Sequence, residues 1–575
     1  MSSALAPSIG AGAAVPVSSA THDLGSGGLR RMRWWGWGDP GHPAGLPPHA
    51  LGFLRETVGL GATPAPPVAL ENVRIDPSSI PSRTLDGLRD VLGSQHVRDD
   101  HGDRVLHAAG KGYPDLVRLR AGAPAGAPDA VLYPASHEQL RELLSACARD
   151  SLAVVPFGGG TSVVGGVEPL RGPHRGVVSL DMCRMARMLA LDEASLTVRL
   201  QAGARARELE RWLAGRGLTL GHFPQSFEYV SLGGCAATRS AGQASTGYGR
   251  FERMVQGLRL VAPAGDVELA AIPASAAGPG MREIVVGSEG TLGVIDELSL
   301  RVRPAPTERL YEGVFFESFH EGVHAFRELS RHHAAPDVAR LSDEQETRMS
   351  LALAGSGGAK GRLGRAYLGV RGYGGGCLAI LGFEGEASEV SERRKRALAI
   401  VRSAGGLRAG RSPGQAWLAS RFSAPYLRDE LLTQGVMVET LETATPWSNL
   451  EALHARVRDA IDAALRAFGT PGLVMCHVSH LYDTGASLYF TFLAAQKQGE
   501  ELAQWRLAKQ AASAAILDGG GTITHHHAVG CDHAPWMERE IGATGVRALR
   551  ALKAELDPAG IMNPGKLLPA SGRLA

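Results

Sequence analysis

The sequence predicts an α+β protein with more than one domain, on two observations. The chain has 575 residues, 44% of them apolar, which is more than a single hydrophobic core usually accommodates. From about residue 127, short apolar runs alternate with stretches whose apolar residues recur at three- and four-residue steps. Since strand and helix patterns are mixed along the chain, we expect both kinds of element in each domain.

The N-terminal region precedes this alternation. Residues 1–30 are mostly small, and we expect them to be flexible. We expect residues 31–125 to form an extension that packs on the body of the protein. It contains the run Trp34-Trp35-Gly36-Trp37-Gly38, whose large aromatic rings are costly to leave in water.

Two larger domains follow. In residues 126–306, Leu196, Val198 and Leu200 alternate as in a strand, and the domain ends near Pro304-Ala305-Pro306. Residues 307–520 form a second domain with three long helical patterns, at 388–404, 450–468 and 501–517. Residues 521–575 form a last segment, with a helix predicted at 546–555.

The composition excludes several classes of protein. Lys plus Arg number 60 and Asp plus Glu 58, so the net charge of +2 offers no general surface for nucleic acid. The six cysteines have no CxxC spacing, which is typical of reduced thiols. No run of about 18 apolar residues predicts a transmembrane helix.

Three glycine-rich loops carry the chemical signal. The first is Pro156-Phe157-Gly158-Gly159-Gly160-Thr161-Ser162, where consecutive glycines let backbone N–H groups converge on an anion such as pyrophosphate. It matches neither GxGxxG nor GxxxxGK[ST]. The second loop runs from 224 to 249 and the third from 287 to 295. One such loop is often a structural turn, but three in one domain favour a binding site.

In this order the loops resemble the pyrophosphate- and flavin-contacting segments of the vanillyl-alcohol oxidase and p-cresol methylhydroxylase flavoproteins. The resemblance implies a two-subdomain FAD-binding fold, an α+β cap domain that covers the substrate, and a helical C-terminal segment that returns to the FAD site. Because the first loop contains no histidine, we expect FAD to be bound non-covalently. The resemblance assigns FAD binding to Pro156, Gly158, Gly159, Gly160, Thr161, Ser162, Pro224, Ser226, Gly233, Gly234, Thr238, Ser240, Gly242, Tyr248, Glu289, Gly290, Thr291, Gly293 and Ile295.

Four further stretches, at residues 35–38, 114–120, 480–490 and 524–530, resemble the alkyldihydroxyacetonephosphate synthases. That family implies exchange of the acyl chain of acyl-dihydroxyacetone phosphate for a long-chain fatty alcohol. The exchange would pass through an adduct at flavin N5 with no net redox. The family also implies a homodimer, and lipid substrates imply at least transient contact with a membrane.

The triplet His525-His526-His527 has three possible interpretations. It could bind a metal, but on an extended chain His525 and His527 would face one side and His526 the other, so we expect no metal. It could be a solvated loop. It also follows a strand-like entry at Thr522-Ile523-Thr524, where the family places an active-site loop, and imidazoles that titrate near neutral pH suit proton transfer.

The resemblance indicates three more site residues. Tyr489 lies in a strand-like run and would ordinarily be a core aromatic, but the matching tyrosine in the family is an acid/base group; Tyr482 is the alternative. Arg340 and Arg428 match arginines of the cap domain, and a guanidinium suits a phosphate. Asp429 could instead simply pair with Arg428.

Two departures keep other functions open. Gln225 replaces an acidic residue of the eukaryotic synthases, and residues 557–566 look more like the dehydrogenase relatives. An FAD-dependent 2-hydroxy-acid or alcohol dehydrogenase or oxidase is therefore the alternative, and a non-catalytic flavin-fold protein is the third. The chain ends in Gly572-Arg573-Leu574-Ala575 rather than an SKL-type peroxisomal signal, so we expect a cytoplasmic, bacterial protein.

Overall fold

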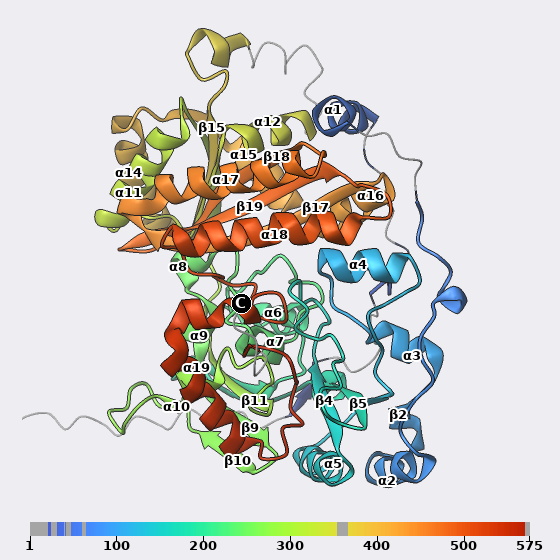
Figure 1. The fold of residues 1–575 in the computed structure, drawn as a ribbon. Helices are drawn as coiled ribbons and strands as arrows, with labels where there is room; N and C mark the ends of the chain where they lie inside the picture. The colour runs from blue at the N-terminus through green and yellow to red at the C-terminus, as the bar shows by residue number, and fades with distance from the viewer. Residues whose placement is uncertain are drawn as a thin grey trace, which may run out of the picture.

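The computed structural model describes residues 21–24, 32–39, 41, 46, 48–59, 65–353 and 366–569. Of the segment predicted to be flexible, only residues 21–24 are among these, and His22–Asp23 form strand β1; the rest of that prediction lies outside the described residues. The chain forms two stacked bodies (Figure 1). The lower one contains most of the residues up to about 304 and the C-terminal segment, and the upper one contains strand β13 to helix α18 together with helix α1.

The lower body contains a small, mostly parallel sheet. Its order is β2 (Val97–Arg98), β3 (Ala130–Leu132), β5 (Gly176–Asp181) and β4 (Leu152–Phe157), with β3, β5 and β4 parallel. Helix α5 (His137–Asp150) connects β3 to β4 and packs beside α2 (Ser82–Leu92). The short connection after β4 is the first glycine-rich loop.

A six-stranded antiparallel sheet completes the lower body. Its order is β1, β6 (Arg187–Asp192), β7 (Thr197–Gln201), β11 (Val294–Arg301), β9 (Val255–Ala262) and β10 (Gly265–Leu269). The alternation predicted around Val198 and Leu200 is confirmed as β7. The short elements around this sheet are α6 (Ala206–Ala214), β8 (Leu218–Thr219), α7 (Leu232–Ala237), α8 (Ser245–Tyr248), α9 (Phe251–Met254), α10 (Met281–Val285) and β12 (Arg303–Pro304).

The upper body is a seven-stranded antiparallel sheet covered by helices. The strand order is β16 (Leu407–Gly410), β13 (Glu308–Phe316), β15 (Cys377–Gly385), β14 (Val338–Ser342), β18 (Gly472–Leu481), β19 (Gly485–Ala495) and β17 (Val436–Pro446). One apolar cluster joins Phe383 and Phe490 of the sheet to the helices α11 (Phe319–Arg331), α14 (Ala387–Ser403), α17 (Leu450–Ala467) and α18 (Glu501–Asp518). The three long helices predicted in this region are therefore confirmed within two residues at each end.

Further helices belong to the N-terminal extension and to the upper body. They are α1 (Pro48–Val58), α3 (His101–Leu106), α4 (Tyr113–Arg120), α12 (Glu344–Leu353), α15 (Arg411–Ser420) and α16 (Ala424–Thr433). Helix α4 contacts both α18 and β17 of the upper body. No helix in the described part of the chain is both long and apolar enough to cross a bilayer.

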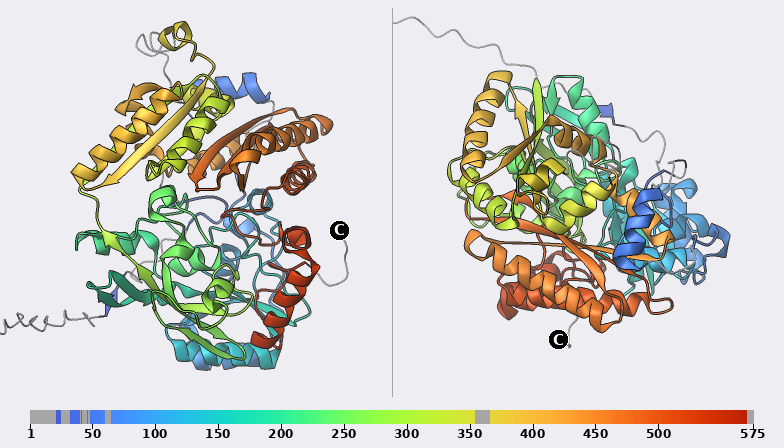
Figure 2. Two further views of the ribbon diagram at one scale, coloured as in Figure 1. Left: turned by 90° about the vertical axis from the view of Figure 1, so that its left-hand side faces the viewer. Right: turned by 90° about the horizontal axis from the view of Figure 1, so that it is seen from above.

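The C-terminal segment returns to the lower body, as both views in Figure 2 show in red. Helix α19 (Met537–Leu556) begins earlier than the predicted 546 and is interrupted at Gly542, whose φ is +76°. Beyond it, Met562 pairs with Val154 of β4 and the Asn563 N–H donates to the Val154 carbonyl at 2.8 Å. The small parallel sheet is thus extended by the end of the chain.

The strand-like entry predicted for Thr522-Ile523-Thr524 is wrong. This stretch is irregular, because after one backbone bond, from the Thr522 N–H to the Ala444 carbonyl of β17 at 3.2 Å, its polar groups bond to side chains. The Ile523 N–H donates to Glu540 Oε2 at 2.9 Å, and the Thr524 hydroxyl donates to Glu442 Oε1 at 2.8 Å.

Candidate active site

The first glycine-rich loop packs directly on the second. A Cβ at Gly158 would lie 2.1 Å from Ser231 Oγ, and a Cβ at Gly159 would lie 2.4 Å from the Tyr229 carbonyl oxygen. Gly160 has φ +65°, in the left-handed region that favours glycine. The three glycines are therefore required by close approach and by backbone conformation.

The same loop leaves backbone donors free. Among the described residues, no protein group accepts a hydrogen bond from the backbone N–H groups of residues 158–162. The Ser162 carbonyl is used, since it accepts from Lys111 N–H at 2.6 Å. Unpaired backbone N–H groups suit a bound pyrophosphate, which is the role expected of Gly158, Gly159, Gly160, Thr161 and Ser162.

The second loop builds one wall of the site. Ser231 caps helix α7 by accepting from Gly234 N–H at 3.2 Å, and Thr238 donates to the Gly234 carbonyl at 2.8 Å. The Gly242 carbonyl accepts from His480 Nε2 of the upper body at 2.9 Å. Because this bond crosses between the two bodies, it fixes where the second loop faces the upper sheet. Pro224, Ser226, Gly233 and Ser240 belong to the same loop.

Tyr248 is engaged elsewhere. Its hydroxyl donates to Glu384 Oε2 of β15 at 2.7 Å, and its ring is buried in the hydrophobic core of the lower body. The FAD-binding role that the resemblance assigned to Tyr248 therefore has no support from its side chain. This tyrosine joins the two bodies instead.

The third loop connects the first loop to the C-terminal segment. Glu289 Oε1 and Oε2 accept from the N–H groups of Val529 and Gly530 at 2.8 and 2.7 Å. Burial raises the pKa of Glu289 to about 7. A Cβ at Gly290 would lie 2.8 Å from Pro156 Cγ, so the first and third loops are in contact. Thr291, Gly293 and Ile295 continue from this loop into β11.

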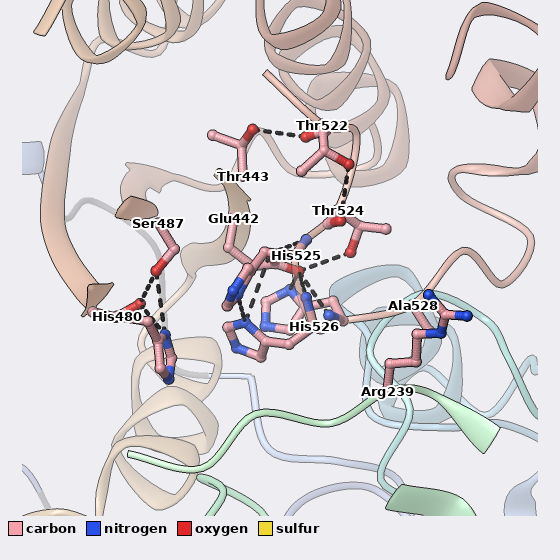
Figure 3. A network of polar contacts seen from close by, with 12 residues as sticks. Arg239, Glu442, Thr443, His480, Ser487, Thr522, Thr524, His525, His526 and Ala528 are labelled. Atoms are coloured by element: carbon pink, nitrogen blue, oxygen red, sulfur yellow. Dashed lines mark hydrogen bonds and ion pairs between the residues drawn. The ribbon is translucent and has the colours of Figure 1, made fainter. Parts of the chain in front are cut away.

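The histidine triplet is held by one buried carboxylate, Glu442 of β17 (Figure 3). Glu442 accepts from the backbone N–H groups of His525, His526 and His527, the latter two at 2.9 and 2.6 Å. Burial works against its ionisation, but the histidine segment, whose backbone N–H groups donate to the carboxylate, holds the pKa of Glu442 well below its usual range. Glu442 therefore stays a carboxylate and fixes the loop.

The expectation that these imidazoles titrate near neutral pH is wrong. Burial lowers the pKa of His526 to about 3, against the opposing effect of Glu442, and it also lowers the pKa values of His525 and His527. The loop is thus neutral at physiological pH. Neutral imidazoles can accept a proton but do not start as acids.

Two tyrosines contact the loop. Tyr489 lies opposite both Glu442 and His477 in the sheet register, so the three side chains share one sheet face. Its ring stacks on His477 and His526, with centroids 4.9 and 5.9 Å apart, and burial raises the pKa of Tyr489 to about 12. Tyr482, the alternative, has its hydroxyl 2.5 Å from His525 Nε2. Both tyrosines therefore belong to the site.

Arg340 joins this cluster from β14. Its Nη1 lies 3.0 Å from His477 Nε2, and its Nη2 donates to Glu346 Oε1 at 2.6 Å. Burial of Glu346 disfavours its ionised form, but Arg340 and His477 outweigh this effect and lower the pKa of Glu346 to about 2. Since Glu346 also bonds His477, at 3.1 Å, Arg340 supports the histidine on which Tyr489 stacks.

Arg428 lies in different surroundings. Its Nη1 donates to the Lys111 carbonyl at 2.6 Å, whereas Nε and Nη2 are buried with no hydrogen-bond partner among the described residues. Asp429 does not simply pair with it: Asp429 Oδ2 accepts from the Trp37 N–H, and Trp37 is 3% exposed. No contact of the described side chains joins Arg428 to Arg340, so the two predicted arginines are not brought together.

The arrangement of the triplet also differs from the extended chain that we expected. His525 Nδ1 and His526 Nδ1 are 3.0 Å apart, so these neighbours face one another. With Glu442 they form the one group of three in the described residues whose ligand atoms could hold a metal ion. The two imidazoles already satisfy each other by a hydrogen bond, so nothing in the donor set requires one.

Comparison with known proteins decides the family. Residues 128–270 match the family described as FAD binding domain, and residues 305–567 match FAD linked oxidases, C-terminal domain. The chain is 33% identical to the alkyldihydroxyacetonephosphate synthase of Dictyostelium discoideum, over 94% of each chain. It belongs to the alkyldihydroxyacetonephosphate synthase family. FAD is therefore its cofactor.

Solved structures agree with this family. A crystal structure of an alkyldihydroxyacetonephosphate synthase superposes with a TM-score of 0.82 and 30% identity, covering 93% of this chain and 99% of that one. p-Cresol methylhydroxylase superposes with a TM-score of 0.65 at 14% identity, covering 87% of this chain and all of that one. The predicted α+β, two-subdomain FAD-binding fold is confirmed.

Sequence reasoning missed three residues of this synthase-family site. Glu442 left a signal, since an acidic residue stands in the otherwise strand-like run Val436–Pro446. His480 begins the stretch 480–490 that resembles the family, whereas His222 left no signal beyond its type. Burial lowers the pKa of each to about 3, and His222 Nε2 lies 3.1 Å from Ser240 Oγ.

Proposed function

We propose that this enzyme makes the ether bond of ether lipids, by exchanging the acyl chain of acyl-dihydroxyacetone phosphate for a long-chain fatty alcohol. The carbon–oxygen bond to the fatty acid breaks and one to the alcohol forms, so the fatty acid leaves as carboxylate and the alcohol's proton is released. The observation that carries this proposal is the neutral histidine loop, fixed by Glu442 beside Tyr489 and the flavin-binding loops.

The protein's own contribution is proton transfer. Because burial keeps His525, His526 and His527 neutral, each can accept a proton from the substrate carbon or from the alcohol. Tyr489 has a pKa raised to about 12 and stays protonated, so it suits hydrogen-bond donation to a substrate oxygen. The ionised Glu442 stabilises whichever imidazole becomes charged.

The two arginines take different parts. Arg428 binds the substrate phosphate, because its buried Nε and Nη2 need an acceptor that the described residues do not supply. Arg340 is committed to Glu346 and His477, so it positions Tyr489 through the stacked His477. This assigns phosphate binding to Arg428 and a supporting role to Arg340.

The described residues fit FAD. The free N–H groups of residues 158–162 suit its pyrophosphate, and the second and third loops line the space beside the histidine loop. Non-covalently bound flavin supplies a nucleophilic nitrogen and no net oxidation or reduction.

The remaining proposals follow from the substrates and the family. We expect a cytoplasmic homodimer that touches membranes at least transiently, because both substrates are lipids. Sedimentation with phospholipid vesicles tests the membrane contact, and light scattering tests the dimer.

The decisive experiment is an anaerobic assay of the flavin-loaded protein with palmitoyl-dihydroxyacetone phosphate and hexadecanol, without an electron acceptor. Ether product and free fatty acid in equal amounts support the synthase. If no ether forms and a hydroxy acid or alcohol bleaches the flavin, the enzyme is the dehydrogenase of the alternative reading.

A further inference from the structure

Asn563 lies between the third glycine-rich loop and Gly166, which follows the first loop by four residues. Its Nδ2 donates to the Glu289 carbonyl at 2.7 Å and to the Gly166 carbonyl at 3.2 Å. The residue is 2% exposed and has φ +39°. The side chain therefore holds the ends of two loops together from a fixed backbone position in the C-terminal segment.

These contacts determine which way the amide points. Both neighbours are carbonyl oxygens, which only accept, so the nitrogen must face them and the oxygen must face away. Oδ1 is buried and has no hydrogen-bond donor among the described residues. A buried carbonyl oxygen without a donor is unfavourable, so a donor outside the described protein is expected.

A second buried polar atom, the hydroxyl oxygen of Ser288, also lacks a hydrogen-bond partner among the described residues. Ser288, next to Glu289 in the third loop, is 3% exposed, and its Oγ is buried without a partner in the described part of the chain. Two unpaired polar atoms thus occur where the first and third loops meet. This is the region in which the free N–H groups of residues 158–162 also lie.

We propose that Asn563 is an FAD-binding residue, whose Oδ1 accepts a hydrogen bond from an N–H or O–H group of the bound flavin nucleotide. FAD has such donors in its ring N3–H, its ribityl and ribose hydroxyls and its adenine amino group. The C-terminal segment thereby contributes directly to the cofactor site and does more than cover it.

The chain offers a matched control. Asn449, in the upper body, also uses Nδ2 to bond two acceptors, Thr445 Oγ1 at 2.9 Å and the Gly519 carbonyl at 2.6 Å. Its Oδ1 is not a buried, unpartnered atom. Replacing Asn449 removes a similar loop-holding amide without removing the acceptor that we assign to FAD.

The test is a comparison of cofactor affinity, measured by flavin fluorescence on apoprotein reloaded with FAD. We expect Asn563→Leu to weaken FAD binding about tenfold or more, and Asn449→Leu to leave it unchanged. If Asn563→Leu does not fold, Asn563→Ser replaces it, with near-UV circular dichroism of the apoprotein as the check of folding.

Analogues of FAD separate a direct hydrogen bond from mere loop holding. The wild type and Asn563→Leu are titrated with 3-methyl-FAD, with FAD analogues that each lack one sugar-chain hydroxyl, and with an inosine analogue that lacks the adenine amino group. One analogue should bind the wild type more weakly than FAD yet bind Asn563→Leu as well as FAD does. If Asn563→Leu loses the same factor toward every analogue, Asn563 only holds the loops and the proposal is overturned.

Discussion

The Glu442 cluster and the Arg428 cluster are both buried and charged, but they differ in how far the protein satisfies them. Around Glu442, one carboxylate accepts three backbone N–H groups and a threonine hydroxyl, so its hydrogen bonds are complete. Around Arg428, two guanidinium nitrogens are buried with no partner in the described chain, and Asp429 Oδ1 is in the same state.

This difference distinguishes the Glu442 cluster, which holds the histidine loop in place, from the Arg428 cluster, which we expect to bind a ligand. The hydrogen bonds of Glu442 hold the backbone of the histidine loop before any substrate arrives, and His527 Nδ1 is the one atom of the triplet that is buried without a hydrogen-bond partner among the described residues. An incomplete network carries an energetic cost that a ligand removes, so the Arg428 cluster gains most when an anion binds. Four predictions test this contrast, in order of decreasing effect.

Glu442→Gln should have the largest effect, on stability. An amide offers one acceptor where the carboxylate has two, so at least one backbone N–H of the histidine loop loses its partner. We expect the free energy of unfolding to fall by roughly 3 kcal/mol or more, measured by urea titration of the holoenzyme. Glu384→Gln is the control, because this carboxylate accepts from two tyrosine hydroxyls and faces Arg309 but accepts from no loop backbone among the described residues. Equal losses of unfolding free energy in the two variants would mean that Glu442 contributes no more to stability than Glu384 does.

Lys111, whose carbonyl accepts from Arg428 and whose Nζ donates to the Arg33 carbonyl at 2.9 Å, should show the cost of burying a charge as a pH dependence. Burial lowers its pKa from 10.5 to about 8, so between pH 8 and 10.5 the unfolded chain holds a proton that the folded protein has released. Stability from this group therefore rises with pH across that window, by on the order of 3 kcal/mol. The stability advantage of Lys111→Met over the wild type should shrink from pH 7 to pH 10.

The exposed Lys497, which pairs with Glu500 at the surface, supplies the comparison for that experiment. Lys497→Met removes a lysine charge without removing a buried one, so the pH dependence expected of Lys111→Met should be absent from it. A pH-independent difference for Lys111→Met as well would show that the lysine is not penalised by burial.

His526→Ala should lower turnover about a hundredfold while FAD remains bound, the lower end for loss of an acid/base group. Because burial lowers the pKa of His526 to about 3, the wild-type kcat should show no ionisation of this group between pH 5 and 9. Single-turnover rates and the flavin absorbance give the two readouts. His320→Ala, at an exposed position on α11, serves as the control; a full-rate His526→Ala enzyme removes this histidine from the mechanism.

Arg428→Lys should have the smallest effect and the most specific one. Lysine keeps the charge but loses the planar pair of donors, so KM for the phosphorylated substrate should rise about tenfold with kcat nearly unchanged. KM for the same ester without its phosphate should not change. Arg456→Lys, on the exposed side of α17, is the matched substitution; a kcat effect without a KM effect would place Arg428 elsewhere in the reaction.

The sequence predicted the regular elements better than the irregular ones. Helix α14 runs from Ala387 to Ser403, against the predicted 388–404, because its amphipathic pattern is local. The stretch Thr522-Ile523-Thr524 failed because its conformation depends on Glu442 and Glu540, and nothing nearby in sequence indicates those partners.

The candidate site, like the fold, could be predicted only where the determining pattern is local in sequence. The glycines of the first loop were found because their spacing carries the conformational requirement itself. Glu442 was missed because its role arises from contacts with residues more than 80 positions away. The neutral state of the histidines was missed for a related reason, since burial, which sets it, is a property of the folded protein.

The pairing of Met562 with Val154 has a consequence for biosynthesis. The small parallel sheet gains its last partner only when residue 562 has left the ribosome, after the whole upper body has been made. Until then, the nascent lower body lacks the bonds that Asn563, Val529 and Gly530 make with the third glycine-rich loop. The contacts that these residues make with the cofactor loops therefore form late in synthesis, after those of the lower body's own strands.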